Sequence, residues 1–320
     1  MWWDKPNPNK PPAREREPLP FMKWRVIGYL VSVLILVATT VSLATQGLNM
    51  GLDFTGGIQI EAARESGFDP GQVRSQLAGL GYEEGNTNVT TTPDRKTVFI
   101  RLPILEGQGE IDTVARQVTD VLGQGVTIRG ASAVSGKVSD ELLRGGLIAC
   151  LFALVAIAAY IWFRFESKFG WAAFITTFHD VYAILGLFSI TRMTFDLTIV
   201  AGALTLAGYS INDKVVVFDR IREMLKKYKR LPLPRIIDIS ITSTLSRTLI
   251  TSLATMMAGG AMLFLGGDVL FGFAASICFG IIIGTYSSIF VAAPLLISLP
   301  GRVPGQRVEK AEDETAAAAT

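Results

Sequence analysis

The residues of this sequence most able to do chemistry are three polar residues in a row inside an apolar stretch. Asn212, Asp213 and Lys214 interrupt a run that begins near Leu197 and continues through residues 215–218. A carboxylate in the middle of a membrane-spanning helix costs about 2.5–3.5 kcal/mol, so it needs a partner, a water-filled cavity or a function. Asp213 is therefore a candidate functional residue. The alternative is a structural ion pair that joins two helices.

The composition favours a membrane protein with several spans. Of the 320 residues, 49% are hydrophobic and 18% are charged, and the mean hydropathy is +0.39. Six apolar runs are long enough to cross a bilayer of about 30 Å. We place them at residues 26–46, 145–163, 171–190, 197–218, 248–266 and 269–299. The last run is long and interrupted by glycines, so we expect it to be tilted or kinked.

The distribution of Lys and Arg indicates the orientation of these spans. Basic residues precede the first run, lie between the second and third and between the fourth and fifth, and follow the last. These segments share one side if six spans alternate, and the positive-inside rule makes that side cytoplasmic. We expect an uncleaved first span, both termini in the cytoplasm, a flexible Pro-rich tail at 1–25, a basic cytoplasmic loop at 219–246 and a C-terminal tail at 301–320.

Residues 47–143 read as a small α+β domain on the opposite, extracytoplasmic side. Asp69 and Pro70 are an N-cap and first residue of a helix, and β-branched runs flank a turn at residues 93–96. The predicted order β-α-β-β-α-β is that of a ferredoxin-like domain. The domain has no His and no Cys. We therefore expect a part that moves or binds rather than an enzyme.

Two further groups of polar residues lie in predicted spans. His179 and Asp180 fall in the third span, where they would form a polar relay or a helix contact. In the fifth span Thr244, Arg247 or Thr248, Thr251 and Thr255 recur every three or four residues, which predicts a polar face turned into the helix bundle. Arg247 lies at a depth similar to that of Asp213, so we expect the two to meet. The single His and the two cysteines, all in spans, predict no metal site and no disulfide.

Three strings of residues are specific in combination. GLDFTGG follows the first span, AGYSINDKVVVFDRIRE lies on the fourth and LSRTLITS on the fifth. From about residue 22 to residue 300 the sequence resembles the SecF family, whose members work with SecD in bacterial protein export. The resemblance implies half of an RND-type bundle, with six transmembrane helices and one periplasmic domain between the first two, in the bacterial inner membrane.

The resemblance also implies roles for particular residues. Asp213 and Arg247 match the proton-pathway positions of the family, and His179 and Asp180 match its HDV element. The DFTGG element at the periplasmic exit corresponds to Asp53, Phe54, Thr55, Gly56 and Gly57. Lys214 stands where the family leads us to expect a hydroxyl residue, and adds positive charge beside Asp213.

The function implied is help with protein export at the expense of the proton gradient. No cofactor is expected: protons are the coupling ion, with Na⁺ as the alternative. The implied partners are SecD, the SecYEG translocon, YajC, YidC, the unfolded exported polypeptide and membrane lipid, with no nucleic acid. Two other functions stay open. One is an RND-type small-molecule efflux component, and the other is a structural scaffold in which Asp213 and Arg247 form a static contact.

Overall fold

The computed structural model describes residues 18–82, 87–92, 94–103, 111–229 and 231–300. The tail predicted at 301–320, and most of the one predicted at 1–25, lie outside these residues. The chain divides into two compact units. A helical unit comprises residues 1–48, 152–193 and 201–320, and a sheet unit comprises residues 49–151 and 194–200. Each is described by itself.

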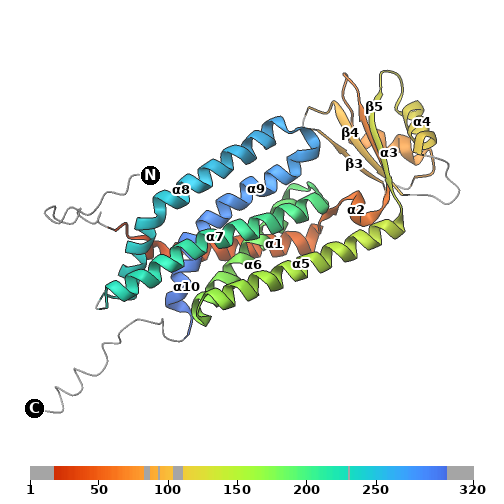
Figure 1. Cartoon of the computed structure of the whole chain (residues 1–320). Coiled ribbons are helices and arrows are strands. Elements are labelled where there is room, and N and C mark those ends of the chain that lie inside the picture. The colour runs from red at the N-terminus through yellow and green to blue at the C-terminus, as the bar shows by residue number, and fades with distance from the viewer. Residues whose placement is uncertain (1–17, 83–86, 93, 104–110, 230, 301–320) are drawn as a thin grey trace, which may run out of the picture. The chain divides into compact units, whose positions relative to one another are not determined.

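The helical unit consists of long helices that run alongside one another (Figure 1). They are preceded by a short 3-10 helix at Phe21–Trp24. The helices are α1 (Arg25–Gln46), α5 (Gly136–Arg164, which begins in the sheet unit), α6 (Ser167–Thr191), α7 (Leu197–Lys227), α8 (Leu233–Leu265), α9 (Gly267–Ser287) and α10 (Ala293–Ser298).

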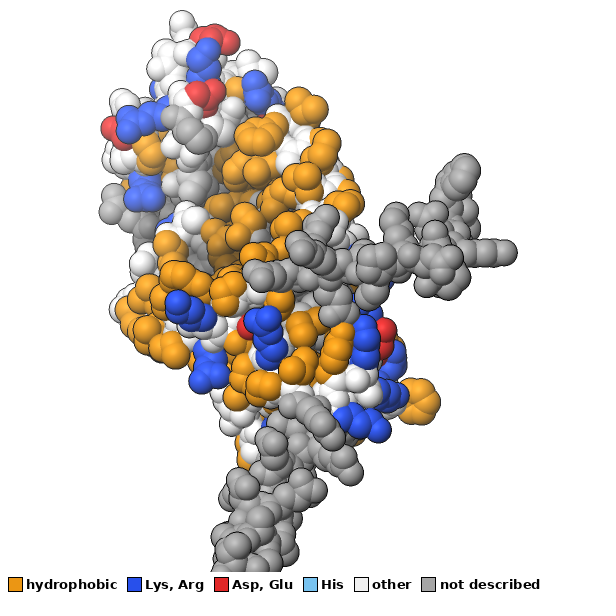
Figure 2. Space-filling model, turned by 90° about the vertical axis from the view of Figure 1, so that its left-hand side faces the viewer, with side chains coloured by type: hydrophobic (Ala, Val, Ile, Leu, Met, Phe, Trp, Pro, Cys, Tyr) orange, Lys and Arg blue, Asp and Glu red, His pale blue; other side chains and the backbone are white. Residues whose placement is uncertain are grey.

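Five helical stretches among the described residues are long and apolar enough to cross a membrane. They are Phe21–Gln46, Gly136–Arg164, Ser167–Thr191, Leu233–Leu265 and Leu270–Ser298. Large apolar side chains are exposed along α1, α5 and α8, and Figure 2 shows hydrophobic side chains over much of one face. Helix α7, which contains the fourth of the six predicted spans, is not among the five. Its apolar stretch is interrupted by Asp213 and Lys214.

The basic segment at 219–246, which the sequence predicts to be a loop, is mostly helical. Helix α7 continues to Lys227 and α8 already begins at Leu233. Phe218, Ile221 and Leu225 recur at helical spacing and are buried in the largest apolar core of the helical unit. This apolar stripe carries α7 beyond its membrane-type segment, because the helix gains burial there although its outer face is charged.

The last predicted span is interrupted, but not at its glycines. A π-helical turn, Ser288–Ala292, joins α9 to α10. Such a turn widens the helix locally and shifts the direction in which the following side chains point. It also brings Ser287 and Ser288 into the interior, where both are fully buried.

The sheet unit contains a four-stranded antiparallel sheet in the spatial order β3-β4-β2-β5. Its elements follow one another as β2 (Gly57–Ala63), α3 (Pro70–Ala78), β3 (Asn88–Thr91), β4 (Thr97–Leu102), α4 (Ile111–Leu122) and β5 (Thr127–Val134). This is the predicted β-α-β-β-α-β succession. Asp69 caps α3 as expected, since its Oδ1 accepts from the Gly71 N–H at 3.2 Å.

One face of this sheet is an apolar core shared with α3 and α4. Ile58, Ile60 and Ala62 lie opposite Leu102, Ile100 and Val98 on the neighbouring strand, and all six are buried. Val73 and Leu77 of α3 and Val114 and Val118 of α4 complete the core. Alternation of burial along β2 and β4 is what the sequence pattern of a half-buried strand predicts.

A second, two-stranded sheet lies within the same unit. Strands β1 (Asn49–Met50) and β6 (Thr194–Phe195) are parallel, and a single helical turn, α2 (Leu52–Thr55), leads from β1 towards β2. Gly57 starts β2 with φ +115°, and a Cβ there would lie 2.6 Å from the Leu102 carbonyl oxygen. Only glycine fits this backbone. Strand β6 leads directly into α7.

Candidate functional site

Asp213 is buried in the helical unit and is held by hydroxyl groups. Thr248 of α8 donates to its Oδ1 at 2.8 Å, and Ser288, at the start of the π-helical turn, donates to its Oδ2 at 2.6 Å. The residue is 9% exposed. Three segments far apart in the sequence therefore meet at this carboxyl group.

A second buried carboxylate is Asp180 of α6. Its partner is Lys214, the residue that follows Asp213 on α7. The Lys214 ammonium lies 2.7 Å from Asp180 Oδ2, and both side chains are fully buried. Ser210 and Ser287 donate to the same oxygen at 2.5 and 2.8 Å. The other oxygen, Oδ1, lies 3.0 Å from His179 Nδ1. Lys214 also donates to Ser210, one turn earlier on α7.

The two carboxyl groups are suited to different tasks. Asp180 has an ammonium partner and three further polar neighbours, so its ionised form is compensated inside the protein. Asp213 contacts hydroxyls, which can donate to a carboxylate or accept from a protonated carboxyl group. The surroundings of Asp213 therefore accommodate both of its protonation states, as a proton-binding group requires.

The predicted contact between Asp213 and Arg247 is not present. Among the described residues no ion pair joins the two, and Arg247 is exposed on α8. Arg247 and Thr248 are consecutive, so their side chains point about 100° apart around the helix. Since Thr248 faces Asp213, Arg247 turns away.

The polar row of α8 that faces inward differs from the predicted row after Thr244, because it contains Ser252 in place of Thr251. Thr244, Thr248 and Ser252 follow at steps of four and form the inward row, and Ser252 lies 2.8 Å from Thr285. Thr251 is exposed, and its hydroxyl donates to the Arg247 carbonyl of its own helix. The sequence allowed both rows, and the choice depends on which one faces α7.

The two remaining polar candidates, His179 and Asn212, make no hydrogen bond to Asp213 within the described ranges. His179 is buried and its Nε2 has no hydrogen-bond partner in the described part of the chain. Asn212 is exposed and lines a shallow cavity of about 370 Å³ between α5 and α7. It therefore does not join the contacts of Asp213, although it precedes it in sequence.

The DFTGG element holds the start of α7 inside the sheet unit. Asp53 Oδ2 accepts from the Leu197 N–H at 3.1 Å, and Asp196 Oδ1 accepts from the N–H groups of Thr198 and Ile199 at 2.9 and 3.1 Å. Two carboxylates thus satisfy the first free N–H groups of α7 and complement its positive end. Phe54 stacks on Phe195, and Thr55 donates to the Gly51 carbonyl.

Arg101 of β4 joins the four-stranded sheet to the two-stranded one. Its guanidinium donates to Gln59 Oε1 at 3.0 Å, to the Met50 carbonyl at 2.9 Å and to Thr194 Oγ1 at 2.5 Å. Burial lowers the pKa of Arg101 from its usual value, and the carboxylates of Asp196 and Asp53 act in the opposite direction. The start of α7 is therefore bound to the sheet by side chains as well as by β6.

Sequence reasoning missed several residues of these two sites. Ser210 had a signal, since it lies one turn before Lys214 within the matched string on α7. Ser287 and Ser288 are adjacent hydroxyls in an apolar run, which is a weaker signal. Arg101 and Thr194 carried none, because their contact depends on the pairing of β1 with β6.

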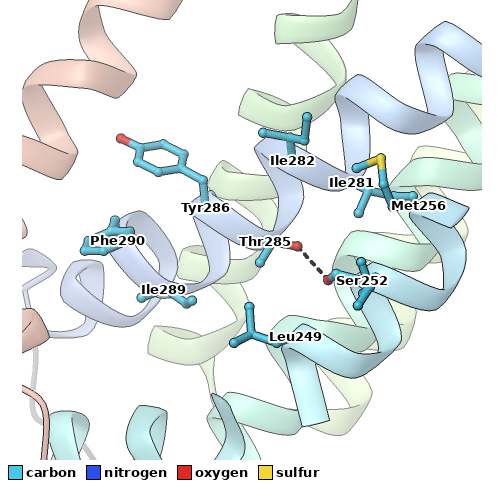
Figure 3. Close-up of a pocket in the computed structure, with 10 residues that line it drawn as sticks. Leu249, Ser252, Met256, Ile281, Ile282, Thr285, Tyr286, Ile289 and Phe290 are labelled. Carbon is cyan, nitrogen blue, oxygen red and sulfur yellow. Dashed lines mark hydrogen bonds between the residues drawn. The ribbon is translucent and has the colours of Figure 1, made fainter. Parts of the chain in front are cut away.

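A groove of about 420 Å³ lies between α8 and α9 and is almost entirely apolar (Figure 3). Leu249 and Met256 line it from α8, and Ile281 and Ile282 from α9. In Figure 3 Ser252 and Thr285 point towards each other across it. Of the residues that the structure describes, no charged one lines this groove, so it fits an apolar helix or lipid chain better than an ion.

Apolar helices of membrane-spanning length, with ionisable side chains buried among them, define a membrane protein. The chain belongs to the SecD/SecF family of protein-export membrane proteins. The family model described as "Protein export membrane protein SecD/SecF, C-terminal" matches residues 114–302, and the "SecD/SecF GG Motif" matches residues 41–64. The GG-motif match contains the DFTGG element.

Relatives of this chain are named as translocase subunits. It is 39% identical over 289 residues to the protein translocase subunit SecF of Desulfurispirillum indicum, covering 87% of this chain and 91% of that one. The SecF of Pseudomonas aeruginosa is 39% identical over 280 residues, with 87% and 90% covered. The SecDF of Brucella abortus is 38% identical over 280 residues.

The fold matches that of a solved SecDF. The crystal structure of SecDF from Thermus thermophilus, described as a translocon-associated membrane protein, aligns with a TM-score of 0.81 at 32% identity and covers 90% of this chain. This chain spans 39% of that protein, and 37% of the Brucella SecDF. It therefore corresponds to one part of the longer SecDF chains.

Proposed function

We propose that this chain is a proton-gradient-coupled accessory subunit of the Sec translocase. With a SecD partner it would promote the translocation of proteins across the inner membrane and their release on the periplasmic side. The observation that carries the proposal is Asp213, a buried carboxyl group held by two hydroxyls. Membership of the SecD/SecF family and the names of its relatives support the role in export.

In this proposal α7 also spans the membrane, which brings the number of spans to six, and the sheet unit is a ferredoxin-like periplasmic domain. With 31 residues, α7 is about 46 Å long, which exceeds a hydrocarbon core of about 30 Å. Its charged residues Asp213 and Lys214 are buried, so the helix does not present them to lipid. The antiparallel order β3-β4-β2-β5 with two helices supports the domain assignment. Both termini would be cytoplasmic.

The energy released by proton movement at Asp213 would be transmitted to the sheet unit as a displacement of α7. One elementary charge moving across 100 mV supplies about 2.3 kcal/mol, enough to bias an equilibrium between two conformations. Helix α7 carries Asp213 in the helical unit, and its first residues are held in the sheet unit by Asp53 and Arg101 through β6. Displacement of α7 would therefore displace the domain.

Arg247 remains part of the proposal as the group that alternates with Thr248. Its side chain is long and begins one residue before Thr248 on α8. A change of rotamer with a turn of α8 would bring the guanidinium to Asp213 and favour proton release, because a nearby cation stabilises a carboxylate. The proposed partners are SecD and SecYEG, with YajC and YidC as further members of the assembly and the exported polypeptide as substrate.

The test is export in membrane vesicles that contain this chain, SecD and the translocon. Asp213→Asn removes the titrating carboxyl group and keeps the hydrogen-bonding shape. We expect it to abolish the part of export that depends on an imposed proton gradient. Asp219→Asn, about two turns further along α7 in a half-buried ion pair with Arg164, is the matched control and should leave that part unchanged.

Retention of full gradient dependence by Asp213→Asn would refute proton coupling through this site. Dependence on a sodium gradient instead of a proton gradient would identify Na⁺ as the coupling ion, since the oxygen ligands around Asp213 also suit that cation. An unchanged assembly with SecD but no gradient effect in any variant would favour a scaffold.

A further inference from the structure

We infer that the buried Lys214–Asp180 ion pair is a positioning unit for Asp213, which keeps Asp213 as the carboxyl group that titrates. The inference rests on the proposed function and assigns a role to Lys214 in it. The carboxyl groups of Asp180 and Asp213 lie in the same helical unit, and residues adjacent in sequence contact each of them. Lys214 follows Asp213 on α7, and Ser287 precedes Ser288 at the π-helical turn.

The positive charge of Lys214 is compensated by the carboxylate of Asp180. Its side chain is fully buried, and its ammonium contacts Asp180 and Ser210. A buried ammonium without a counter-charge is strongly disfavoured, and a buried carboxylate without one likewise. Together the two residues are neutral. The pair therefore adds little net charge to the surroundings of Asp213 although one member is its neighbour in the chain.

The loss of either member would expose Asp213 to an uncompensated charge. Without Asp180, the Lys214 ammonium would favour the ionised form of Asp213. Without Lys214, the Asp180 carboxylate would disfavour it. Both effects act between buried groups, where charge interactions are weakly screened. The two losses should thus move the titration of Asp213 in opposite directions.

The π-helical turn connects the two carboxyl groups mechanically. In a regular α-helix consecutive side chains point about 100° apart, which separates their contacts. Here Ser287 donates to Asp180 and Ser288 donates to Asp213, from the last residue of α9 and the first of the widened turn. A displacement of Asp180 would therefore be transmitted to the hydroxyl that holds Asp213.

Several titratable groups lie within about one turn of the residues of this site on the helices around it. His179, Asp180 and Tyr182 come from α6, Tyr209, Asp213 and Lys214 from α7, Arg247 from α8 and Tyr286 from α9. The Tyr182 hydroxyl lies 3.1 Å from that of Thr40. Tyr286 donates to the Gly28 carbonyl and Tyr209 to Ser252, so neither hydroxyl contacts Asp213. Arg247 is exposed. The Lys214–Asp180 pair is then the charged group through which a substitution can most directly alter Asp213.

The experiment compares three variants in the vesicle assay over a range of pH. The quantity measured is the pH at which gradient-dependent export is half-maximal. Asp180→Asn should lower this midpoint by about 1 pH unit or more, and Lys214→Met should raise it by a similar amount. The double variant, which is neutral, should return to the wild-type midpoint. Arg220→Met with Glu223→Gln removes an exposed ion pair of α7 and serves as control.

Single variants with lower activity but the wild-type midpoint would overturn the inference, since that is the result of a merely structural pair. A double variant displaced as far as a single one would also overturn it. If the single variants do not accumulate in the membrane, the double variant decides. It should accumulate with the wild-type midpoint, and its failure to accumulate, or a shifted midpoint, contradicts the inference. Loss of the inference leaves Asp213→Asn unaffected, and the proposed function is judged by that variant alone.

Discussion

At the scale of single residues, the Asp213 carboxyl group is held by hydroxyl groups and, among the described residues, not by a charged side chain. Asp213 has Thr248 and Ser288 as its partners, and both can reverse the direction of their hydrogen bonds. An arginine permanently at this position would hold the carboxylate ionised, which would impede proton uptake. The position of Arg247 away from Asp213 is therefore compatible with a state that is ready to take up a proton.

Thr248→Val tests the hydroxyl contact directly. The substitution conserves shape and removes one hydrogen bond to a buried carboxyl group, a contact worth about 1.5–3 kcal/mol. We expect gradient-dependent export to fall about tenfold. Thr251→Val, on the same helix but exposed and bonded only to its own backbone, is the control and should retain the wild-type rate. Equal activity of the two variants would show that Thr248 does not assist Asp213.

The residues of this site differ in how far the sequence could predict them. Asp213 was evident because a carboxylate in an apolar run has few structural explanations. Its partner was mispredicted, since Arg247 and Thr248 are adjacent and only the rotation of α8 decides between them. The pairing of Lys214 with Asp180 needed the packing of α6 against α7, on which local patterns carry no information.

At the scale of elements, the start of α7 is the best-defined junction of the sheet unit. Asp53 is a residue of the DFTGG element, yet its side chain caps a helix that begins 144 residues later. The sequence predicted the element and the helix separately. Their contact depends on the parallel pairing of β1 with β6, two strands of two residues each, which are too short to be recognised from periodicity.

Asp53→Ala should loosen the first turn of α7. Removal of an N-cap carboxylate costs about 1 kcal/mol. Hydrogen exchange of the Leu197 amide should therefore become about fivefold faster, whereas the Thr198 and Ile199 amides keep their acceptor on Asp196. Asp120→Ala, at an exposed position of α4, is the control. Unchanged exchange at Leu197 would mean that Asp53 does not contribute to the cap in solution.

The hairpin between β3 and β4 should respond to acid. Hydrogen bonds from Thr92 and from the Lys96 N–H lower the pKa of Asp94 below 3.8, and the Lys96 ammonium lowers the pKa of Glu65 below 4.5. A carboxyl group whose pKa is lowered by folding stabilises the folded state above its unfolded pKa. That contribution is lost as the pH falls through the folded pKa.

We therefore expect hydrogen-exchange protection of the Lys96 and Thr97 amides to hold above about pH 4.5 and to decline below it. In Asp94→Asn the part of the decline due to this residue should be absent, and protection should be lower at neutral pH. Glu65→Gln removes the partner of Lys96 and should have the smaller effect, since that ion pair is exposed. A decline that is identical in all three proteins would contradict the assignment.

At the scale of the whole molecule, α7, like α5, has residues in both units. The covalent connections at α1 and α5 were predicted from the order of spans. The attachment through β6 and the start of α7 was not, because the sequence places residues 194–200 in a short turn between two apolar runs. If the sheet unit is driven by the helices, this third attachment determines which helix drives it.

A disulfide between β1 and β6 tests whether that attachment persists while the protein works. Asn49 and Thr194 are paired neighbours on parallel strands, at a spacing that a disulfide can bridge. In a background without Cys150 and Cys278, the double variant Asn49→Cys, Thr194→Cys should cross-link on oxidation and keep its gradient-dependent export, because the start of α7 moves with the sheet unit. Each single cysteine variant is the control for oxidation alone. Loss of export on oxidation, and its recovery on reduction, would show that β1 and β6 separate during the cycle, and the sheet unit would then be driven through α1 or α5.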